Sequence, residues 1–262
     1  MRRRGQSYVA AMLAVFVAFV ALLATLPSVV PLTAVADKVD TALLSVNETL
    51  KGCCAHASSE AWKVFYSGKI GGGGGATASA ADRFLARARA CWSTCRDLIQ
   101  GYYGLLVGGE PSFEHGGSTL TCKAELSVSK RGTVSKLKWV KSIEMSIVNG
   151  ETAIKGVFPN KYLEINFTLK GVKPPYVQVE VYLLDVQGSE IYLSNVWNGH
   201  LLPVSAEGAT FKYSVERVPI ELKYFARCDA NKQACTLQYI VKASDDTGAC
   251  VWVEGGVDLG GG

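Results

Sequence analysis

The pattern of apolar and polar positions divides the chain into three parts, and the first is an uncharged apolar segment near the N-terminus. Residues 8–26 carry no charged side chain, and the next charge after them is Asp37. An apolar stretch of about 20 residues is long enough to cross a bilayer as a helix. Because Arg2, Arg3 and Arg4 precede this stretch, the positive-inside rule places the N-terminus in the cytoplasm and nearly all later residues outside it. The sequence therefore predicts a membrane-spanning helix within residues 1–36.

Residues 37–110 show the spacing of two amphipathic helices separated by glycines. Apolar residues three to four positions apart mark one face of each expected helix. They are Val39, Leu43, Val46 and Leu50 before the glycines, and Phe84, Ala88, Cys91, Cys95, Leu98 and Tyr102 after them. Residues 71–75 are all glycine, and each glycine costs a helix about 1 kcal/mol relative to alanine. We therefore expect a helical hairpin that turns at 71–75.

From Thr119 onward, apolar positions alternate with polar ones, which is the period of half-buried β-strands. Alternating runs lie at 120–128, 143–147, 163–169, 177–183, 211–215, 220–224 and 237–241. Turn dipeptides such as Asn149-Gly150 separate many of these runs. Roughly nine short strands predict an immunoglobulin-like antiparallel β-sandwich over residues 117–256, followed by a glycine-rich tail at 257–262. The expected fold class is α+β, with an N-terminal apolar helix, a helical hairpin and a β-sandwich.

The chain has eight cysteines, and four of them lie in the expected hairpin. Cys53 and Cys54 lie about 20 residues before the middle of the glycine run, and Cys91 and Cys95 lie about 20 residues after it. An antiparallel hairpin brings the two pairs level, so we expect two disulfides across it, with the connectivity open. The alternative is a zinc site that also uses His56. Adjacent cysteines are poor chelators, and an oxidising exterior favours disulfides.

The other four cysteines belong to the expected β-sandwich. Cys228 and Cys235 flank a short segment that fits a hairpin loop, so we pair them. Cys122 in the first strand and Cys250 in the last would then form a disulfide that ties the ends of the domain together.

The leader carries a family resemblance. Arg3-Arg4-Gly5 is followed by Gln6-Ser7 and then by the apolar segment. This order resembles the leader of archaeal type IV pilins and archaellins over roughly the first 30 residues. The resemblance implies cleavage between Gly5 and Gln6, an apolar helix retained on the mature protein and a β-sandwich head behind it. Two other fates stay open, namely secretion after cleavage behind Ala34-Val35-Ala36 and an uncleaved membrane anchor.

Small residues form a stripe along the apolar segment. They are Ala10, Ala14, Ala18, Ala21 and Thr25, at steps of three and four. Small residues let helices approach closely in lipid, so the stripe predicts self-association through this helix. The alternative is that alanine is simply common in signal anchors. The expected partners are membrane lipid and other copies or surface subunits.

Catalytic patterns are sparse. The chain has three histidines and lacks the common zinc-protease, serine-hydrolase and P-loop motifs. Asp246-Thr247-Gly248-Ala249 matches an element of aspartic proteases, but it occurs once and follows polar residues, and a turn explains it as well. We therefore expect no enzyme activity, no cofactor and no metal.

Charge and glycosylation signals complete the picture. The net charge is +4, and without Arg2 to Arg4 the chain has 24 basic and 23 acidic residues, which argues against nucleic acid as a partner. Asn47 and Asn166 lie in glycosylation sequons.

The expected function is an exported, membrane-anchored cell-surface structural protein, either a pilin-like filament subunit or an adhesion subunit. The alternatives are an anchored extracytoplasmic binding module, including an ectodomain of a membrane complex, and a secreted hydrolase built on Asp246.

Overall fold

The computed structural model describes residues 34–259, with gaps at 73–74, 131–132, 149, 158–159, 173–176, 188–189 and 226–234. The apolar segment at 8–26, its stripe of small residues (Ala10, Ala14, Ala18 and Ala21) and the Gly5–Gln6 junction therefore lie outside the described residues. Within the described part, no helix is both long enough and apolar enough to cross a membrane.

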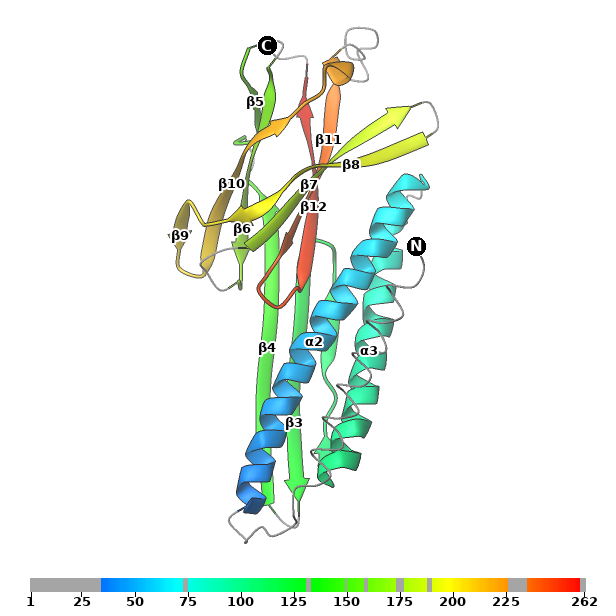
Figure 1. Ribbon diagram of the computed structural model, residues 1–262, viewed down its shortest axis with the longest axis vertical. Coiled ribbons are helices and arrows are strands. Elements are labelled where there is room, and N and C mark those ends of the chain that lie inside the picture. The colour runs from blue at the N-terminus through cyan, green and yellow to red at the C-terminus, as the bar shows by residue number, and fades with distance from the viewer. Residues whose placement is uncertain are drawn as a thin grey trace, which may run out of the picture. The chain divides into compact units, whose positions relative to one another are not determined.

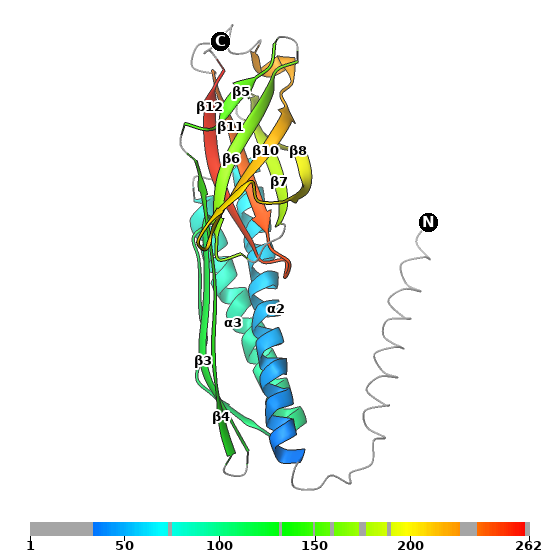
Figure 2. The same cartoon turned by 90° about the vertical axis from the view of Figure 1, so that its left-hand side faces the viewer.

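Two long helices run antiparallel in the region of the expected hairpin (Figures 1 and 2). Helix α2 spans Ala34–Ile70 and helix α3 spans Ala76–Tyr103. A Cβ atom added to Gly68 would lie 2.9 Å from the Cβ of Ala76, so glycine at this position allows the two helices to approach closely. Helix α3 ends where Gly104 adopts a left-handed conformation with φ of 59°, which glycine adopts without a steric penalty.

The buried face of α3 differs from the predicted one in its second half. Phe84 and Ala88 are buried as expected, but the buried residues then continue with Trp92 and Ile99. Leu98 and Tyr102 are instead 66% and 67% exposed. Beyond Ala88 the buried positions therefore lie one residue later than predicted, with Trp92 in place of Cys91 and Ile99 in place of Leu98, while Cys91 and Cys95 are half-buried.

The strands form two antiparallel sheets, which confirms the predicted antiparallel β-structure. The first sheet contains β1 (Leu106–Gly108), β2 (Ser112–His115), β3 (Thr119–Lys130), β4 (Thr133–Ile147), β5 (Ala153–Lys155), β6 (Tyr162–Lys170), β9 (Ser205–Glu207) and β10 (Thr210–Pro219). The second contains β7 (Val177–Gln187), β8 (Glu190–Leu201), β11 (Thr236–Ser244) and β12 (Cys250–Asp258). The order is β1-β3-β4-β6-β10-β9 in the first sheet, with β2 on β3 and β5 on β6, and β12-β11-β7-β8 in the second. Because β1 and β2 pair with β3, strand structure begins within the 37–110 range assigned to the hairpin from sequence.

One strand pair extends beyond the rest of the sheet. Strand β3 pairs with β4 along its whole length, with Thr119 opposite Glu144 and Lys130 opposite Thr133, whereas β4 pairs with β6 only through Glu144–Ile147. Helices α2 and α3 lie along the extended part of this pair (Figures 1 and 2). On β3 the predicted apolar residues are buried, namely Leu120, Cys122, Ala124, Leu126 and Val128. The helix pair and the β3–β4 pair therefore bury one continuous apolar interface, and we call this unit the stalk.

The two faces of the second sheet have different partners. Trp252 and Tyr182 lie against Trp62 of α2, with ring centroids 5.4 and 5.2 Å apart. Their strand neighbours Val251 and Val181 are fully buried as well, and successive side chains of a strand point to opposite faces. The second sheet is therefore covered by α2 on one face and by the rest of the core on the other.

One predicted strand is a helical turn instead. Residues 222–225 form a short helical segment, although the run at 220–224 alternates in hydrophobicity. Ile220 and Tyr224 are 6% exposed, whereas Leu222 between them is 49% exposed. The buried pair is thus four residues apart, which is the spacing of a helix face.

The disulfides follow a different plan from the predicted one. Cys53 of α2 pairs with Cys91 of α3, as one option for the hairpin allowed. Cys54 pairs with Cys122 of β3, so the predicted Cys122–Cys250 pairing is wrong. Successive residues of a helix point about 100° apart, so Cys53 and Cys54 cannot both face α3.

Two cysteines among the described residues keep free thiols. Cys95 is half-buried and Cys250 is buried. The second predicted disulfide across the hairpin is therefore absent, because Cys54 faces β3 and leaves Cys95 without a partner of its own. Cys235 is disulfide-bonded, and its predicted partner Cys228 lies outside the described residues.

Candidate functional site

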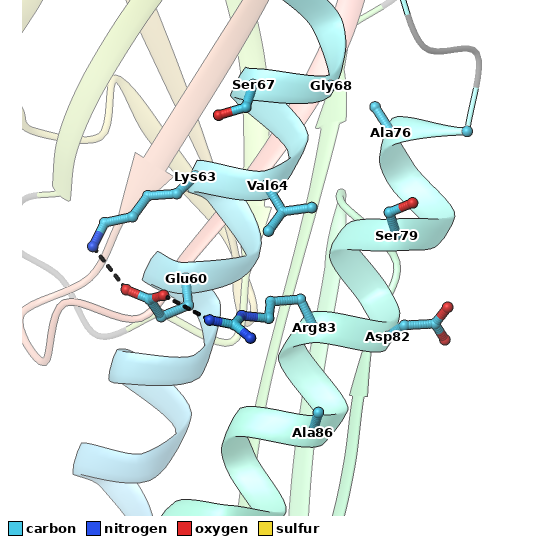
Figure 3. A pocket seen from close by; sticks show the side chains of 11 residues that line it. Glu60, Lys63, Val64, Ser67, Gly68, Ala76, Ser79, Asp82, Arg83 and Ala86 are labelled. Atoms are coloured by element: carbon cyan, nitrogen blue, oxygen red, sulfur yellow. Dashed lines mark hydrogen bonds and ion pairs between the residues drawn. The ribbon is translucent and has the colours of Figure 1, made fainter. Parts of the chain in front are cut away.

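An open groove of about 910 Å³ lies between α2 and α3 near their glycine-rich connection (Figure 3). Small residues line much of it, including Gly68, Ala76 and Ser79. Three of the four charged residues that line it are paired with one another, because Glu60 accepts a hydrogen bond from Lys63 at 2.7 Å and lies 3.6 Å from Arg83. The hydrogen bond from Lys63 is also the main reason that the pKa of Glu60 lies below its usual value. Among the described residues that line this groove, none is a histidine.

A smaller cavity of about 380 Å³ lies beside the turn between β11 and β12. Lys141 and Asp245, which both line this cavity, form an ion pair, with the Lys141 Nζ 2.5 Å from the Asp245 Oδ2. Their side chains are only 12% and 8% exposed. Asp245 Oδ1 also accepts hydrogen bonds from the Thr247 hydroxyl and from the backbone N–H groups of Thr247 and Ala249. Lys141 in turn donates to the Thr247 hydroxyl. The carboxylate thus organises the turn and holds the buried ammonium of β4.

The protease-like element is this same turn. Gly248 adopts a left-handed φ of 83°, and its N–H donates to the carbonyl of Asp245 at 3.0 Å. Asp246, the residue that the sequence match would make catalytic, is exposed. The buried carboxylate belongs to Asp245, which is engaged by Lys141 and by the turn. The described contacts account for this element through turn geometry.

Replacing Asp245 with asparagine is expected to lower the free energy of unfolding by about 2 kcal/mol, because the buried Lys141 ammonium then loses its counter-charge. Asp246→Asn is the matched control, and at this exposed position we expect a change within about 0.5 kcal/mol. Guanidinium unfolding of both variants checks the prediction. Equal stabilities for the two variants would contradict the role given to the ion pair.

His115 of β2 is a buried histidine that sequence reasoning did not single out. Its ring packs between Phe84 of α3 and Trp252 of β12, with centroids 5.1 and 4.6 Å away. Nδ1 accepts a hydrogen bond from the N–H of Gly117, so the proton lies on Nε2, which donates to the Cys250 carbonyl at 3.1 Å. Burial lowers the pKa of His115 to about 4. The neutral ring therefore ties β2 to the helix pair and to β12.

Acid is expected to weaken the fold through His115. The folded-state pKa is about 4, against an ordinary value of 6.5, so between these values only the unfolded chain takes up this proton. The contribution of the neutral His115 ring to the free energy of unfolding is complete above pH 6.5 and falls as the pH drops towards 4. At pH 5 the loss relative to pH 7 is about 2 kcal/mol, from 1.36 kcal/mol per unit. Denaturant unfolding at the two pH values should show this loss, and His115→Gln should remove it. An unchanged pH dependence in His115→Gln would contradict the assignment.

Three sulfur atoms gather where α2 and α3 cross-link. The Sγ atoms of Cys53, Cys91 and Cys95 all lie within 4.8 Å of one another. Among the described residues, these three cysteines form the group that could hold a metal ion. Cys54 and His56, which the alternative zinc site of the sequence analysis also used, are not part of it. Cys53 and Cys91 are joined in a disulfide, so only Cys95 offers a thiol. The cluster combines a nucleophilic sulfur with a bonded pair of electrophilic sulfurs.

The two predicted glycosylation residues have different surroundings. The Asn47 side chain is half-buried, and its amide donates to Glu48 at 3.3 Å. Asn166 is 9% exposed, and its amide donates to the carbonyl of Glu151 at 2.9 Å. Although Asn166 lies on the outward side of its strand, residues before β5 cover it. Of the two amides, that of Asn47 is the more accessible one for a glycan.

No family model matches the chain, and no curated protein matches its sequence. The contacts of the described residues are therefore the basis for assigning a function.

Proposed function

We propose that the protein is an exported, membrane-anchored cell-surface structural protein, whose stalk carries a β-sandwich head outside the cytoplasm. The observation that carries the proposal is the covalent cross-linking of α2. Adjacent cysteines of this helix form disulfides with α3 and with β3, and structural disulfides persist in oxidising compartments. The same helix is preceded in the sequence by the uncharged apolar segment at 8–26.

We further propose that the head is immunoglobulin-like. In chain order, β4, β6, β7, β8, β9, β10, β11 and β12 would correspond to strands A, B, C, C′, D, E, F and G. The sheet orders β4-β6-β10-β9 and β12-β11-β7-β8 then read A-B-E-D and G-F-C-C′, which is the immunoglobulin arrangement. The extension of β4 and its partner β3 into the stalk is a departure from that pattern.

Exposed apolar residues at one end of the stalk support its orientation toward the membrane. The hydroxyls of Ser45 and Tyr103 lie 3.4 Å apart, so α2 at Ser45 lies beside the end of α3. Near this end Tyr102 and Leu106 are 67% and 71% exposed. Tyrosine is enriched at membrane–water interfaces, so this end suits the side from which the N-terminal segment would enter the bilayer.

Within this proposal, the stripe of small residues in the apolar segment favours a filament or adhesion subunit that associates through that helix. A membrane-anchored binding module is the second candidate. It is favoured by polar residues on the outward side of α2, where Glu48, His56 and Lys63 are exposed.

The mature N-terminus and the accessibility of the head test the proposal together. Mass spectrometry should find a mature chain that begins at Gln6 after prepilin-type cleavage or at Met1 for an uncleaved anchor. Added protease should remove the head from intact cells. A mature chain that begins at Asp37 and is free in the medium, or a head protected until the cells are lysed, would contradict it. Electron microscopy of cells that lack the gene separates the candidates, since lost filaments indicate a filament subunit.

A further inference from the structure

We propose that Cys53, Cys91 and Cys95 form a thiol–disulfide exchange site, in which Cys53 of α2 bonds alternately to Cys91 and to Cys95 of α3. The proposal concerns chemistry within the stalk and holds for a filament subunit and for a binding module alike. A negative disulfide map would overturn it without affecting the mature N-terminus that tests the proposed function.

The geometry brings the three sulfurs within reaction range. Cys91 and Cys95 are one helical turn apart on the same face of α3, and Cys53 faces them from α2. All three Sγ atoms lie within 4.8 Å of one another, so the Cys95 sulfur is close to both atoms of the existing disulfide. Cys95 is half-buried rather than enclosed, so its thiol can lose a proton to solvent.

The exchange balances without an external oxidant or reductant. The Cys95 thiol loses its proton to solvent, and the thiolate attacks the Sγ of Cys53. The Cys53–Cys91 bond breaks as the Cys53–Cys95 bond forms, and the Cys91 thiolate leaves and takes up a proton. The product again contains one disulfide and one thiol, and α2 stays covalently joined to α3.

Only two disulfide states are favoured by the helix geometry. Residues four apart on one helix have Cβ atoms about 5–6 Å apart, whereas a disulfide needs about 3.5–4.5 Å. A Cys91–Cys95 bond would therefore require α3 to distort. Cys54 does not compete, because it faces β3 and is bonded to Cys122.

The second free cysteine shows why this site is distinctive. Cys250 is 2% exposed, and burial raises the pKa of its thiol to about 11. Burial also raises the pKa of Cys95, which keeps exchange slow near neutral pH and lets it speed up as pH rises. The Cys95 thiol differs in lying against a disulfide, so it has a reaction partner within the same chain.

Disulfide mapping of single variants of the full chain tests the proposal. Each variant is exported into an oxidising compartment, alkylated with N-ethylmaleimide in denaturant at low pH and digested without reduction. In Cys91→Ser, we expect a Cys53–Cys95 disulfide in most molecules, and in Cys95→Ser we expect the Cys53–Cys91 bond alone. Cys53 recovered mainly as an alkylated thiol in Cys91→Ser would overturn the proposal.

Two further measurements keep the result specific. In Cys122→Ser, the released Cys54 should be recovered as a free thiol, and a Cys54–Cys95 disulfide would overturn the proposal by showing indiscriminate pairing. Wild-type protein held at pH 7, 8 and 9 and quenched with acid should acquire the Cys53–Cys95 bond about tenfold faster per pH unit while the thiol is mostly protonated. Cys91 that never becomes alkylatable after incubation at pH 9 would also overturn it.

Discussion

Removing the disulfide between Cys54 and Cys122 by replacing both residues with alanine is expected to lower the free energy of unfolding by several kcal/mol. The bond closes a loop between residues 68 positions apart. In the chain-entropy model, a loop of this length corresponds to about 4 kcal/mol. Both side chains are fully buried, so the substitution also removes packing contacts between α2 and β3. For a chain of this size, the melting temperature should fall by roughly 10 °C or more.

Thermal unfolding followed by circular dichroism, on the full chain in detergent, measures this effect. Cys95→Ala is the control, because it removes a half-buried thiol that is free in this structure and leaves the Cys53–Cys91 and Cys54–Cys122 bonds in place, and we expect less than about 1 kcal/mol for it. Under reducing conditions, the difference in stability between the double variant and the wild-type protein should shrink to the part that comes from the lost packing contacts. A double variant as stable as the wild-type protein would show that the α2–β3 interface holds without its covalent link.

The spacing of apolar residues predicted the elements well, because helices and half-buried strands each impose a period on burial. The alternation in β3 continues from Leu120 to Val128 without a break, and the structure buries every second residue there. The spacing was less reliable where the strand period and the helix period bury the same two residues. Ile220 and Tyr224 fit an alternating strand and a helical turn equally well, and their packing selects the helical turn.

The cysteine pairing could not be predicted from the sequence. It depends on which element each side chain faces as well as on how far along the hairpin each cysteine lies. The sequence showed that Cys53 and Cys54 lie level with Cys91 and Cys95. It did not show that β3 lies beside α2, and this neighbour takes up the second cysteine of the adjacent pair. A helical wheel would have indicated that adjacent cysteines diverge by about 100°, but not which element receives each one.

The buried polar contacts were also hidden from sequence reasoning. Lys141 and Asp245 are about a hundred positions apart, and neither belongs to a motif. His115 is placed by β2, a four-residue strand too short to give a clear alternation. Such contacts depend on how β12 meets α2 and β2, and that arrangement is set by the whole core.

Trp252→Ala is expected to lower the free energy of unfolding by about 3–5 kcal/mol, the usual cost of removing a large buried aromatic side chain. Trp252 is 2% exposed and lies at the meeting point of α2, β2 and β12. Its ring lies 5.0 Å from Phe65 and 4.6 Å from His115, measured between centroids. Alanine would leave a cavity and remove the ring contacts of Trp252 with Trp62 and Phe65 of α2.

The same substitution should change the titration of His115, which distinguishes a local cavity from a general loss of stability. Trp252 covers one face of the imidazole, so its removal lets water reach the ring. Because burial is the main cause of the lowered pKa, we expect the pKa to move up towards 6.5, as followed by NMR of the imidazole protons.

Trp197→Ala is the matched control, since Trp197 is half-buried on β8 and is not among the rings that contact His115. It should cost less stability and leave the His115 pKa unchanged. A His115 pKa that stays near 4 in Trp252→Ala would show that Phe84 and the backbone around Gly117 suffice to exclude water. The sheet–helix junction would then depend on the helix pair more than on Trp252.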